Sequence, residues 1–422
     1  MSEIRKMLAL WSAAEAAGEE WAVATVIQVE GSSYRKPGAR MLLTRSGSRS
    51  GMVSGGCLEG EISRKIWWLT ENGPAVQRYV SSFDDDAPAG EHPAYGLGCG
   101  GTVYVLMERA STARAILLAL QASVESREPC AVLTVVESTH RNIPIGARMI
   151  VARPDIAQPD IAQPELTAPA LTHSALASSS SIRESTLPPG LEVLAIATQT
   201  LEHRRYSTHT VAYQDQTVRV FAEYVSPPFA LFICGAGDDA QPLAELAHIM
   251  GWHTTIADGR SNLVRTERFP RGDSFAVLDN AVPQLGLSIG PVKLSVDHSN
   301  ANAGAVLLTH SYEQDRELLR TLLPLNLKYL GVLGPRSRTL RLVEEIAPSI
   351  QLPAASISLP SAASISLSVD ECMRRLHAPV GLDLGADAPA GVALAIIAEI
   401  HAKLHDRSAI PLREKASASA RQ

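Results

Sequence analysis

One segment, LFICGAGDDA from Leu231 to Ala240, limits the possible folds more than any other part of the chain. An apolar run ends at the turn Gly235-Ala236-Gly237, and a stretch with apolar residues at helical spacing follows. A strand, a GxGxxA turn and a helix in this order are typical of the first unit of a Rossmann-type domain. Downstream, apolar runs at 253–257, 305–309 and 329–333 alternate with helix-type segments. The sequence therefore predicts an α/β fold with a mostly parallel sheet here.

The remainder of the chain predicts a separate α+β domain in front of the Rossmann-type one. At 422 residues and 45% hydrophobic composition, the chain can bury two cores. Two adjacent prolines at 227–228 mark the expected boundary, which gives an N-terminal domain at 1–226, a Rossmann-type domain at 229–405 and a disordered tail at 406–422. N-terminal strands are expected at 21–29, 41–44, 51–53, 191–197, 207–213 and 218–224. Low-complexity sequence predicts insertions at about 153–190 and 350–368.

Composition excludes several classes of partner. The formal net charge of -6 offers no basic excess for nucleic acid or an anionic membrane. No uncharged apolar run reaches the roughly 18 residues that a membrane-spanning helix needs, so we expect a cytoplasmic protein. The five cysteines are scattered singly, which is typical of free thiols in a reducing compartment.

The glycine turn has the spacing of a dinucleotide site. Gly235 and Gly237 would let the backbone approach a pyrophosphate, and Asp258, 21 residues beyond Gly237, could accept a ribose hydroxyl. Arg260 could meet a phosphate, including the 2'-phosphate of an NADP-like ligand, and Arg336 follows a strand that ends at the same edge of the sheet. These residues are the candidates for binding NAD(P) or another nucleotide.

Two acidic residues leave a second interpretation of that turn open. Asp238 and Asp239 occupy the first turn of the helix, where they would repel a pyrophosphate. They also stabilise the positive end of a helix without any ligand. The turn is therefore either a nucleotide site or a purely structural Rossmann unit.

A basic loop in the first domain predicts an anion site. The segment GSSYRKPGAR at 31–40 places Arg35, Lys36 and Arg40 among glycines and hydroxyl groups between two expected strands. Arginine forks and free backbone amides suit phosphate geometry. The alternative is a solvated hairpin loop, since loops often carry such residues.

Two cysteines stand in glycine-rich settings. Cys57 is expected at the start of a helix, where the helix dipole lowers a thiol pKa and favours a nucleophile or a soft-metal ligand. A small buried residue in a tight turn is the alternative. Cys99 precedes an expected strand, and neither cysteine has companions at zinc spacing. With their neighbouring glycines, they define a candidate site of Cys57, Gly55, Gly56, Cys99, Gly98 and Gly100.

Several ordered segments together resemble one family. These segments are GSSYRKPGARM, SGGCLEGE, GLGCGG, ICGAGDDA, ADGR, LLTHSYEQD, YLGVLGPRSR and APVGLDLGADAPAGVALAIIAEI, and they are similar to the XdhC/CoxI family. The resemblance implies an accessory protein that binds the molybdenum cofactor and inserts its sulfurated form into apo molybdenum hydroxylases such as xanthine dehydrogenase. It also implies contact with a cysteine desulfurase.

On this resemblance, the expected role is that of a chaperone rather than an enzyme. The basic loop would hold the phosphate of the cofactor, and Cys57 would be a possible ligand of molybdenum, with Cys99 beside it. A homo-oligomer is expected as well. Two other classes of function stay open, namely an NAD(P)-dependent oxidoreductase and a non-catalytic docking platform.

Overall fold

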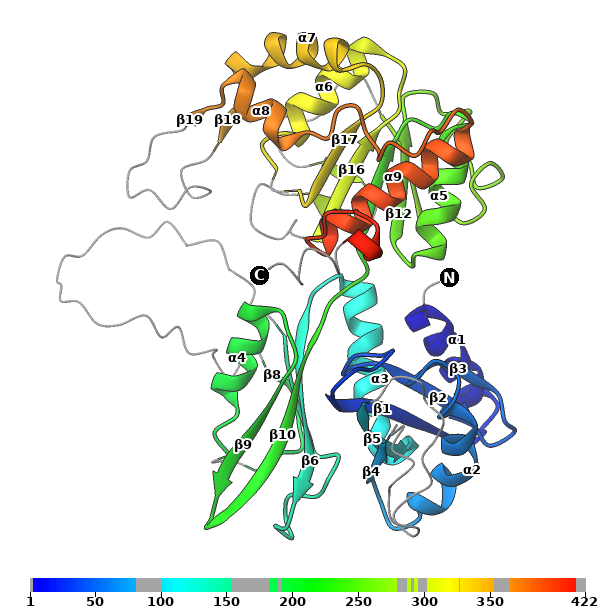
Figure 1. Cartoon of the computed structure of the whole chain (residues 1–422), viewed down its shortest axis with the longest axis vertical. Coiled ribbons are helices and arrows are strands. Elements are labelled where there is room, and N and C mark those ends of the chain that lie inside the picture. The colour runs from blue at the N-terminus through cyan, green and yellow to red at the C-terminus, as the bar shows by residue number, and fades with distance from the viewer. Residues whose placement is uncertain are drawn as a thin grey trace, which may run out of the picture. The chain divides into compact units, whose positions relative to one another are not determined.

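Apolar strand residues build two antiparallel sheets in the first part of the chain. The structure is a computed structural model that describes residues 3–80, 101–152, 182–188, 191–278, 287–289, 292–294, 302–325, 327–352 and 365–414. It divides into two compact units, one from Glu3 to Pro227 and one that begins at Pro228 (Figure 1).

The first sheet of the N-terminal unit has the order β3-β2-β1-β5-β4. Its strands are β1 (Trp21–Glu30), β2 (Arg40–Thr44), β3 (Arg49–Gly51), β4 (Ala75–Val80) and β5 (Thr102–Arg109). Residues along β1 are buried on both faces. Ala24 and Val26 contact α2 (Glu59–Leu69), whereas Val23 packs with α1 (Glu3–Ala16) and α3 (Ala110–Ser126). The sheet is thus covered by helices on both sides.

The second sheet has the order β8-β7-β6-β10-β9. Its strands are β6 (Cys130–Ser138), β7 (Arg148–Ala152), β8 (Ile182–Ser185), β9 (Ser207–Tyr213) and β10 (Gln216–Val225). One face packs on α4 (Leu194–His203), and a small cluster that includes Ile27 and Phe221 joins the two sheets. β8 lies inside the range predicted as an unstructured insertion, whose residues 153–181 lie outside the described part.

The predicted strand at 191–197 is wrong, because this segment starts helix α4. Val193, Ala197 and Thr200 are buried at i, i+4 and i+7, which is the spacing of one helical face. The apolar run therefore follows the helical period and not the strand period. The other expected N-terminal strands are confirmed as β1, β2, β3, β9 and β10, with bounds shifted by a few residues at most.

The C-terminal unit has the fold that the glycine turn predicted. Its strands are β11 (Ala230–Cys234), β12 (His253–Asp258), β13 (Ser274–Val277), β16 (Ala303–Leu307) and β17 (Tyr329–Val332), all parallel in the order β13-β12-β11-β16-β17. The order reverses beside β11, as in a Rossmann domain. A mixed α/β fold with a C-terminal parallel sheet is confirmed.

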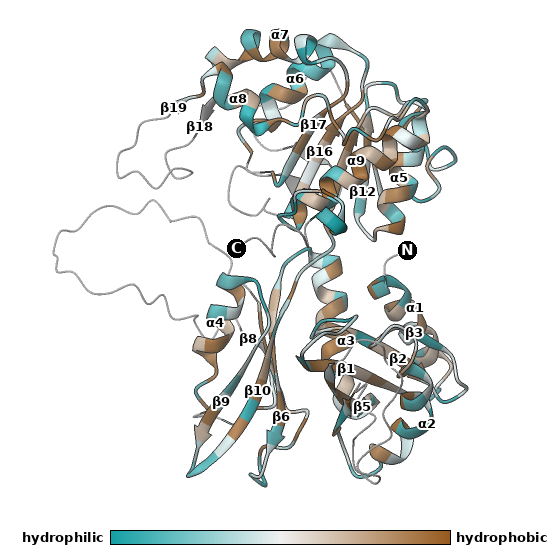
Figure 2. Ribbon diagram, in the orientation of Figure 1, coloured by the Kyte–Doolittle hydropathy of each residue, from teal (hydrophilic) through white to brown (hydrophobic). Residues whose placement is uncertain are grey.

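Helices cover both faces of this parallel sheet. Alternate residues of β11 point to opposite sides, so Leu231 and Ile233 pack with α5 (Ala240–Ile249) and α9 (Pro389–Leu404). Phe232 packs on the other side with α6 (Tyr312–Leu322), α7 (Arg336–Ile346) and α8 (Val369–Arg375). Figure 2 shows hydrophobic residues along the central strands and a mixture of both classes on α5 and α9.

Short elements complete the second unit. They are the hairpin of β14 (Leu287–Ile289) and β15 (Val292–Leu294), the 3-10 helix η3 (Ala347–Ser349), and the paired segments β18 (Gln351–Leu352) and β19 (Ile365–Ser366). The latter two pair at the ends of the insertion predicted at 350–368, whose centre lies outside the described residues. Within the described ranges, no helix combines the length and the apolar character needed to cross a bilayer.

Candidate functional site

A hydrogen-bonded turn between β3 and α2 carries the first predicted cysteine. The Glu59 carboxylate accepts bonds from the amides of Val53 (3.1 Å) and Ser54 (2.7 Å) and from the Ser54 hydroxyl (2.6 Å). The Ser54 oxygen in turn accepts bonds from the amides of Gly56 (3.2 Å) and Leu58 (3.1 Å). Glu59 is 2% exposed, and its buried carboxylate fixes the path of the whole turn.

These hydrogen bonds keep the Glu59 carboxyl ionised. Burial by itself would raise the pKa of the carboxyl, but the bonds from Ser54 and from nearby amides outweigh burial and lower it. A carboxylate that accepts several such bonds stays ionised. The turn is therefore organised around a buried negative charge.

Cys57 lies on the outside of this turn and is exposed. The other described cysteines are Cys130, Cys234 and Cys372, and all three are buried. Burial raises the pKa of the Cys234 thiol to about 12, which keeps it protonated and unreactive. Cys57 is thus the accessible thiol of the described chain, whereas Cys99, Gly98 and Gly100 lie outside the described residues.

The basic loop contacts both of the glycine-rich segments predicted to carry cysteines. The ring of Tyr34, from the basic loop, lies against Gly55, 3.7 Å from the position that a Cβ would take there. Gly101, which ends the second glycine-rich segment, approaches the same loop so closely that a Cβ would lie 2.1 Å from the Ser32 carbonyl oxygen. Residue 101 must therefore be glycine. The basic loop therefore contacts the Cys57 turn through Tyr34 and the residue before β5 through Ser32.

The three predicted cations of the basic loop have different surroundings. Arg40 is buried and forms a bidentate ion pair with Glu223 of β10, so its guanidinium is not available to an anion. Arg35 pairs with Glu3 of α1, and its Nε has no acceptor among the described residues. Lys36 is exposed. The accessible positive charge of the loop comes from Lys36 and in part from Arg35.

A second group of predicted residues lies at the carboxyl edge of the Rossmann sheet. Gly235 has a φ of +122°, and a Cβ on it would lie 2.4 Å from the Leu308 carbonyl oxygen of the neighbouring loop. Asp258 is fully buried, and its oxygens accept bonds from the Ala236 amide (2.7 Å) and from Arg260 (2.9 to 3.0 Å). Both oxygens of Asp258, the residue expected to bind a ribose, thus already accept hydrogen bonds from Ala236 or Arg260.

The Asp239 carboxylate occupies the space next to Gly237, the second glycine of the turn. Asp239 Oδ1 lies 2.7 Å from the position of a Cβ on Gly237, where a pyrophosphate would approach the backbone. The other oxygen, Oδ2, lies 3.2 Å from Nε2 of His310, a residue with a positive φ of 56°. Asp238 pairs with Arg268 at 2.8 Å. The arrangement disfavours an anion at this turn.

The remaining predicted arginine begins α7. Arg336 is exposed, whereas Arg338, two residues further along the helix, bonds to the buried carboxylate of Asp315 at 2.7 Å. Thr309 also donates to Asp315, at 2.6 Å. Across the described part of the chain, no group of three or more His, Cys, Asp or Glu side chains is placed to hold a metal ion.

Comparison with known proteins decides the family. The XdhC Rossmann domain family matches residues 231–400, and the XdhC and CoxI family matches residues 14–80. The chain belongs to the XdhC and CoxI family. The resemblance noted in the sequence is thereby confirmed.

This XdhC and CoxI family member is similar to named relatives. A probable xanthine dehydrogenase subunit of Bacillus subtilis (strain 168) is 28% identical over 384 residues, 90% of this chain and 92% of that protein. An uncharacterized Escherichia coli (strain K12) protein, YqeB, is 25% identical over 170 residues, 40% of this chain and 26% of that protein. The crystal structure of a xanthine dehydrogenase from Bacillus halodurans shares the fold, with a TM-score of 0.65 and 24% identity over 97% of both chains.

Sequence reasoning missed several residues of this family member that shape the site. The frame of the Cys57 turn depends on Ser54 and Glu59, and Glu223 neutralises Arg40. A signal for Glu223 was present, because a lone carboxylate in the apolar run at 218–225 predicts a buried ion pair. The contact of Tyr34 with Gly55 had no comparable signal, since it joins two loops.

Proposed function

We propose that this chain is an accessory protein that binds the molybdenum cofactor, protects its sulfurated form and delivers it to an apo molybdenum hydroxylase such as xanthine dehydrogenase. Membership of the XdhC and CoxI family supports a role in the maturation of such an enzyme, and the name of the Bacillus subtilis relative, a probable xanthine dehydrogenase subunit, supports the class of client. The observation that carries the proposal is the exposed Cys57 thiol on a turn that contacts the basic loop.

The residues around Cys57 suit the chemistry of this cargo. A thiolate is a soft ligand that can contact molybdenum or its terminal sulfur. The exposed ring of Tyr34 offers a flat surface for a pterin, while the exposed ammonium of Lys36 offers hydrogen-bond donors for the phosphate. Cys99 is assigned to the same site on the basis of its sequence setting.

The proposed role requires two partners and transient binding. A cysteine desulfurase would supply sulfur to the cofactor, and the apo hydroxylase would receive it. Cys57 and the basic loop would hold the cargo without chemical change, so the chain acts as a chaperone rather than an enzyme. We propose that it acts in the cytoplasm and forms a homo-oligomer.

Purification from cells that make the molybdenum cofactor tests this proposal. Molybdenum and pterin bound per chain are measured for the wild type and for Cys57→Ser, which keeps the size and removes the soft ligand. We expect bound cofactor in the wild type and a loss of at least about tenfold in the variant. Wild-type protein free of both molybdenum and pterin would refute the proposal.

A charge variant with a matched control sharpens the same test. Lys36→Gln should reduce the amount of bound cofactor, because it removes an exposed cation of the basic loop. Arg205→Gln, at an exposed position after α4, should leave it unchanged. Equal losses in both variants would indicate a nonspecific effect of charge.

Titration calorimetry with NAD and NADP tests the main alternative function, that of an NAD(P)-dependent oxidoreductase. We expect no heat of binding, because the Asp239 carboxylate lies over Gly237 and Asp258 is engaged within the turn. Tight binding of either nucleotide would favour an oxidoreductase function for the Rossmann-type unit.

A further inference from the structure

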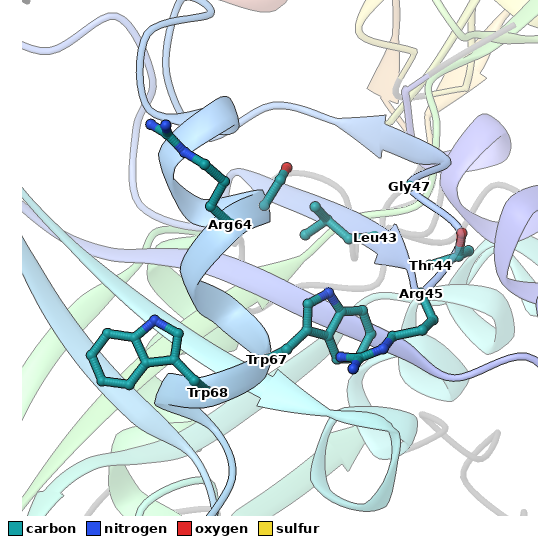
Figure 3. Close-up of a pocket in the computed structure, with 8 residues that line it drawn as sticks. Leu43, Thr44, Arg45, Gly47, Arg64, Trp67 and Trp68 are labelled. Carbon is teal, nitrogen blue, oxygen red and sulfur yellow. The ribbon is translucent and has the colours of Figure 1, made fainter.

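A hollow of about 410 Å³ lies at the C-terminal end of α2, away from the Cys57 turn. It is bounded by the last turns of this helix and by the end of β2 with the turn that follows it, and Arg45, Arg64, Trp67 and Trp68 are among the residues that line it (Figure 3). We call these four residues the α2-end surface. None of them takes part in the site proposed above.

The two tryptophans are presented differently. The Trp67 ring is held in place, with the guanidinium of Arg45 at 4.9 Å and that of Arg109 at 5.9 Å from its centroid. Arg109 also donates to the Trp67 carbonyl oxygen and so fixes the end of the helix. Trp68 is 61% exposed and adds apolar surface to the lining. Exposed apolar surface bordered by polar residues is typical of interaction sites.

The charge of the α2-end surface is positive in a chain with a net charge of -6. The side chains of Arg45 and Arg64 are 57% and 77% exposed. Arg45 lies 3.9 Å from the carboxylate of Glu20, a weak contact. Arg64 bonds at 2.9 Å to Glu61, which is largely buried and pairs with Lys65 as well. Cations therefore exceed accessible carboxylates here, and the complementary ligand is acidic.

The exposure of the lining residues favours a protein segment as the occupant. Small-ligand sites enclose most of the ligand. Four of the eight residues that line this hollow are exposed, among them Arg64 and Trp68, so a small ligand here would stay in contact with solvent. Tryptophan and arginine are the side chains most often found at the energetic centre of protein interfaces. Membrane-binding surfaces insert several apolar groups, whereas Trp68 is the one apolar side chain of the α2-end surface that is largely exposed.

We propose that the α2-end surface docks an acidic segment of the client hydroxylase, with one apolar side chain of that segment seated in the hollow against Trp68. This inference rests on the proposed function and adds the place where the client binds. Helix α2 joins this surface to the Cys57 turn, and its 11 residues span about 16 Å. The client would thus bind at the C-terminal end of α2, and the cargo would lie at its N-terminal end.

Binding of purified apo xanthine dehydrogenase tests the docking surface. Affinity is measured by surface plasmon resonance for the wild type, for Trp68→Ala and for the charge reversal Arg45→Glu/Arg64→Glu. We expect each variant to weaken binding by about tenfold or more, and wild-type binding to weaken as salt rises. Tyr206→Ala and Arg205→Glu, exposed residues after α4, serve as matched controls that should stay within about twofold.

A second measurement distinguishes this inference from the proposed function. Molybdenum and pterin content should be the same in the wild type and in the α2-end variants, because the Cys57 turn is intact. Wild-type affinity in both variants, or no binding of the client by the wild type, would overturn the docking proposal, whatever the cofactor content shows. Binding of anionic lipid vesicles that the same variants abolish would also overturn it, in favour of a membrane surface.

Discussion

Two buried ion pairs join the sheets of the N-terminal unit. Arg40 of β2 pairs with Glu223 of β10, and Arg148 of β7 pairs with Glu108 of β5, which is fully buried. A buried pair contributes little net stability by itself, but a single partner left behind is a buried, uncompensated charge. These four residues should therefore be sensitive to single substitutions and tolerant of paired ones.

Glu223→Gln should lower the free energy of unfolding by about 3–5 kcal/mol, because Arg40 stays buried without its counter-charge. The double variant Arg40→Met/Glu223→Leu should lose less, since both charges are removed together. Urea-induced unfolding followed by circular dichroism gives the comparison. A double variant less stable than the single one would contradict the argument.

The cysteines offer a direct test of the site at the same scale. Brief treatment of the folded protein with a maleimide should label Cys57 and leave Cys130, Cys234 and Cys372 unmodified until denaturant is added, because these three are buried. Peptide mass spectrometry locates the label. Modification of Cys234 before Cys57 would show that the accessible thiol is a different one.

At the scale of elements, the glycine turn after β11 is held by the strand beside it. The Asp258 carboxylate at the end of β12 accepts a hydrogen bond from the Ala236 amide of the turn. It also accepts hydrogen bonds from the Arg260 guanidinium. Burial alone would raise the pKa of Asp258, but these hydrogen bonds lower it below its ordinary value of 3.8. The residue predicted as a ribose ligand acts, in this structure, as a support of the turn.

This support predicts a dependence of stability on pH. The folded carboxyl binds its proton less tightly than the unfolded one, so its stabilising effect is complete above pH 3.8 and is lost as pH falls below that value. Asp258→Asn should lower the unfolding free energy by about 1–3 kcal/mol at neutral pH, since the carboxylate acceptor is lost. In urea titrations the difference from the wild type should shrink below pH 3.8. A difference that is constant over that range would argue against a role of the charge.

Local pattern was enough to predict some elements and not others. The strand and helix periods of the Rossmann-type unit are long and regular, so β11, α5, β12, β16, α6 and β17 were predictable. The short run at 191–197 has no such length, and strand and helix periods are then hard to separate. Partners far apart in sequence, such as Arg40 and Glu223, depend on the tertiary fold and could not be paired from the sequence.

At the scale of the whole molecule, the two units have separate hydrophobic cores. The described clusters of the first unit contain residues up to Val225, and those of the second begin at Phe229. We therefore expect two unfolding transitions in scanning calorimetry. Phe232→Ala, in the core of the second unit, should lower one transition and leave the other in place. A single transition that shifts as a whole would mean that the units unfold together.

The hydrogen-bonded backbone of the Cys57 turn affects how the proposed cargo, the molybdenum cofactor, would bind and dissociate. Five hydrogen bonds centred on Ser54 and Glu59 fix the backbone before any ligand arrives. In the proposed role, capture by the Cys57 thiol would order little more than one side-chain torsion, so little conformational entropy would be lost on binding and little regained on release. In the proposed role, a preformed turn of this kind would leave the contacts of Cys57, Tyr34 and Lys36 with the cargo to set its residence time.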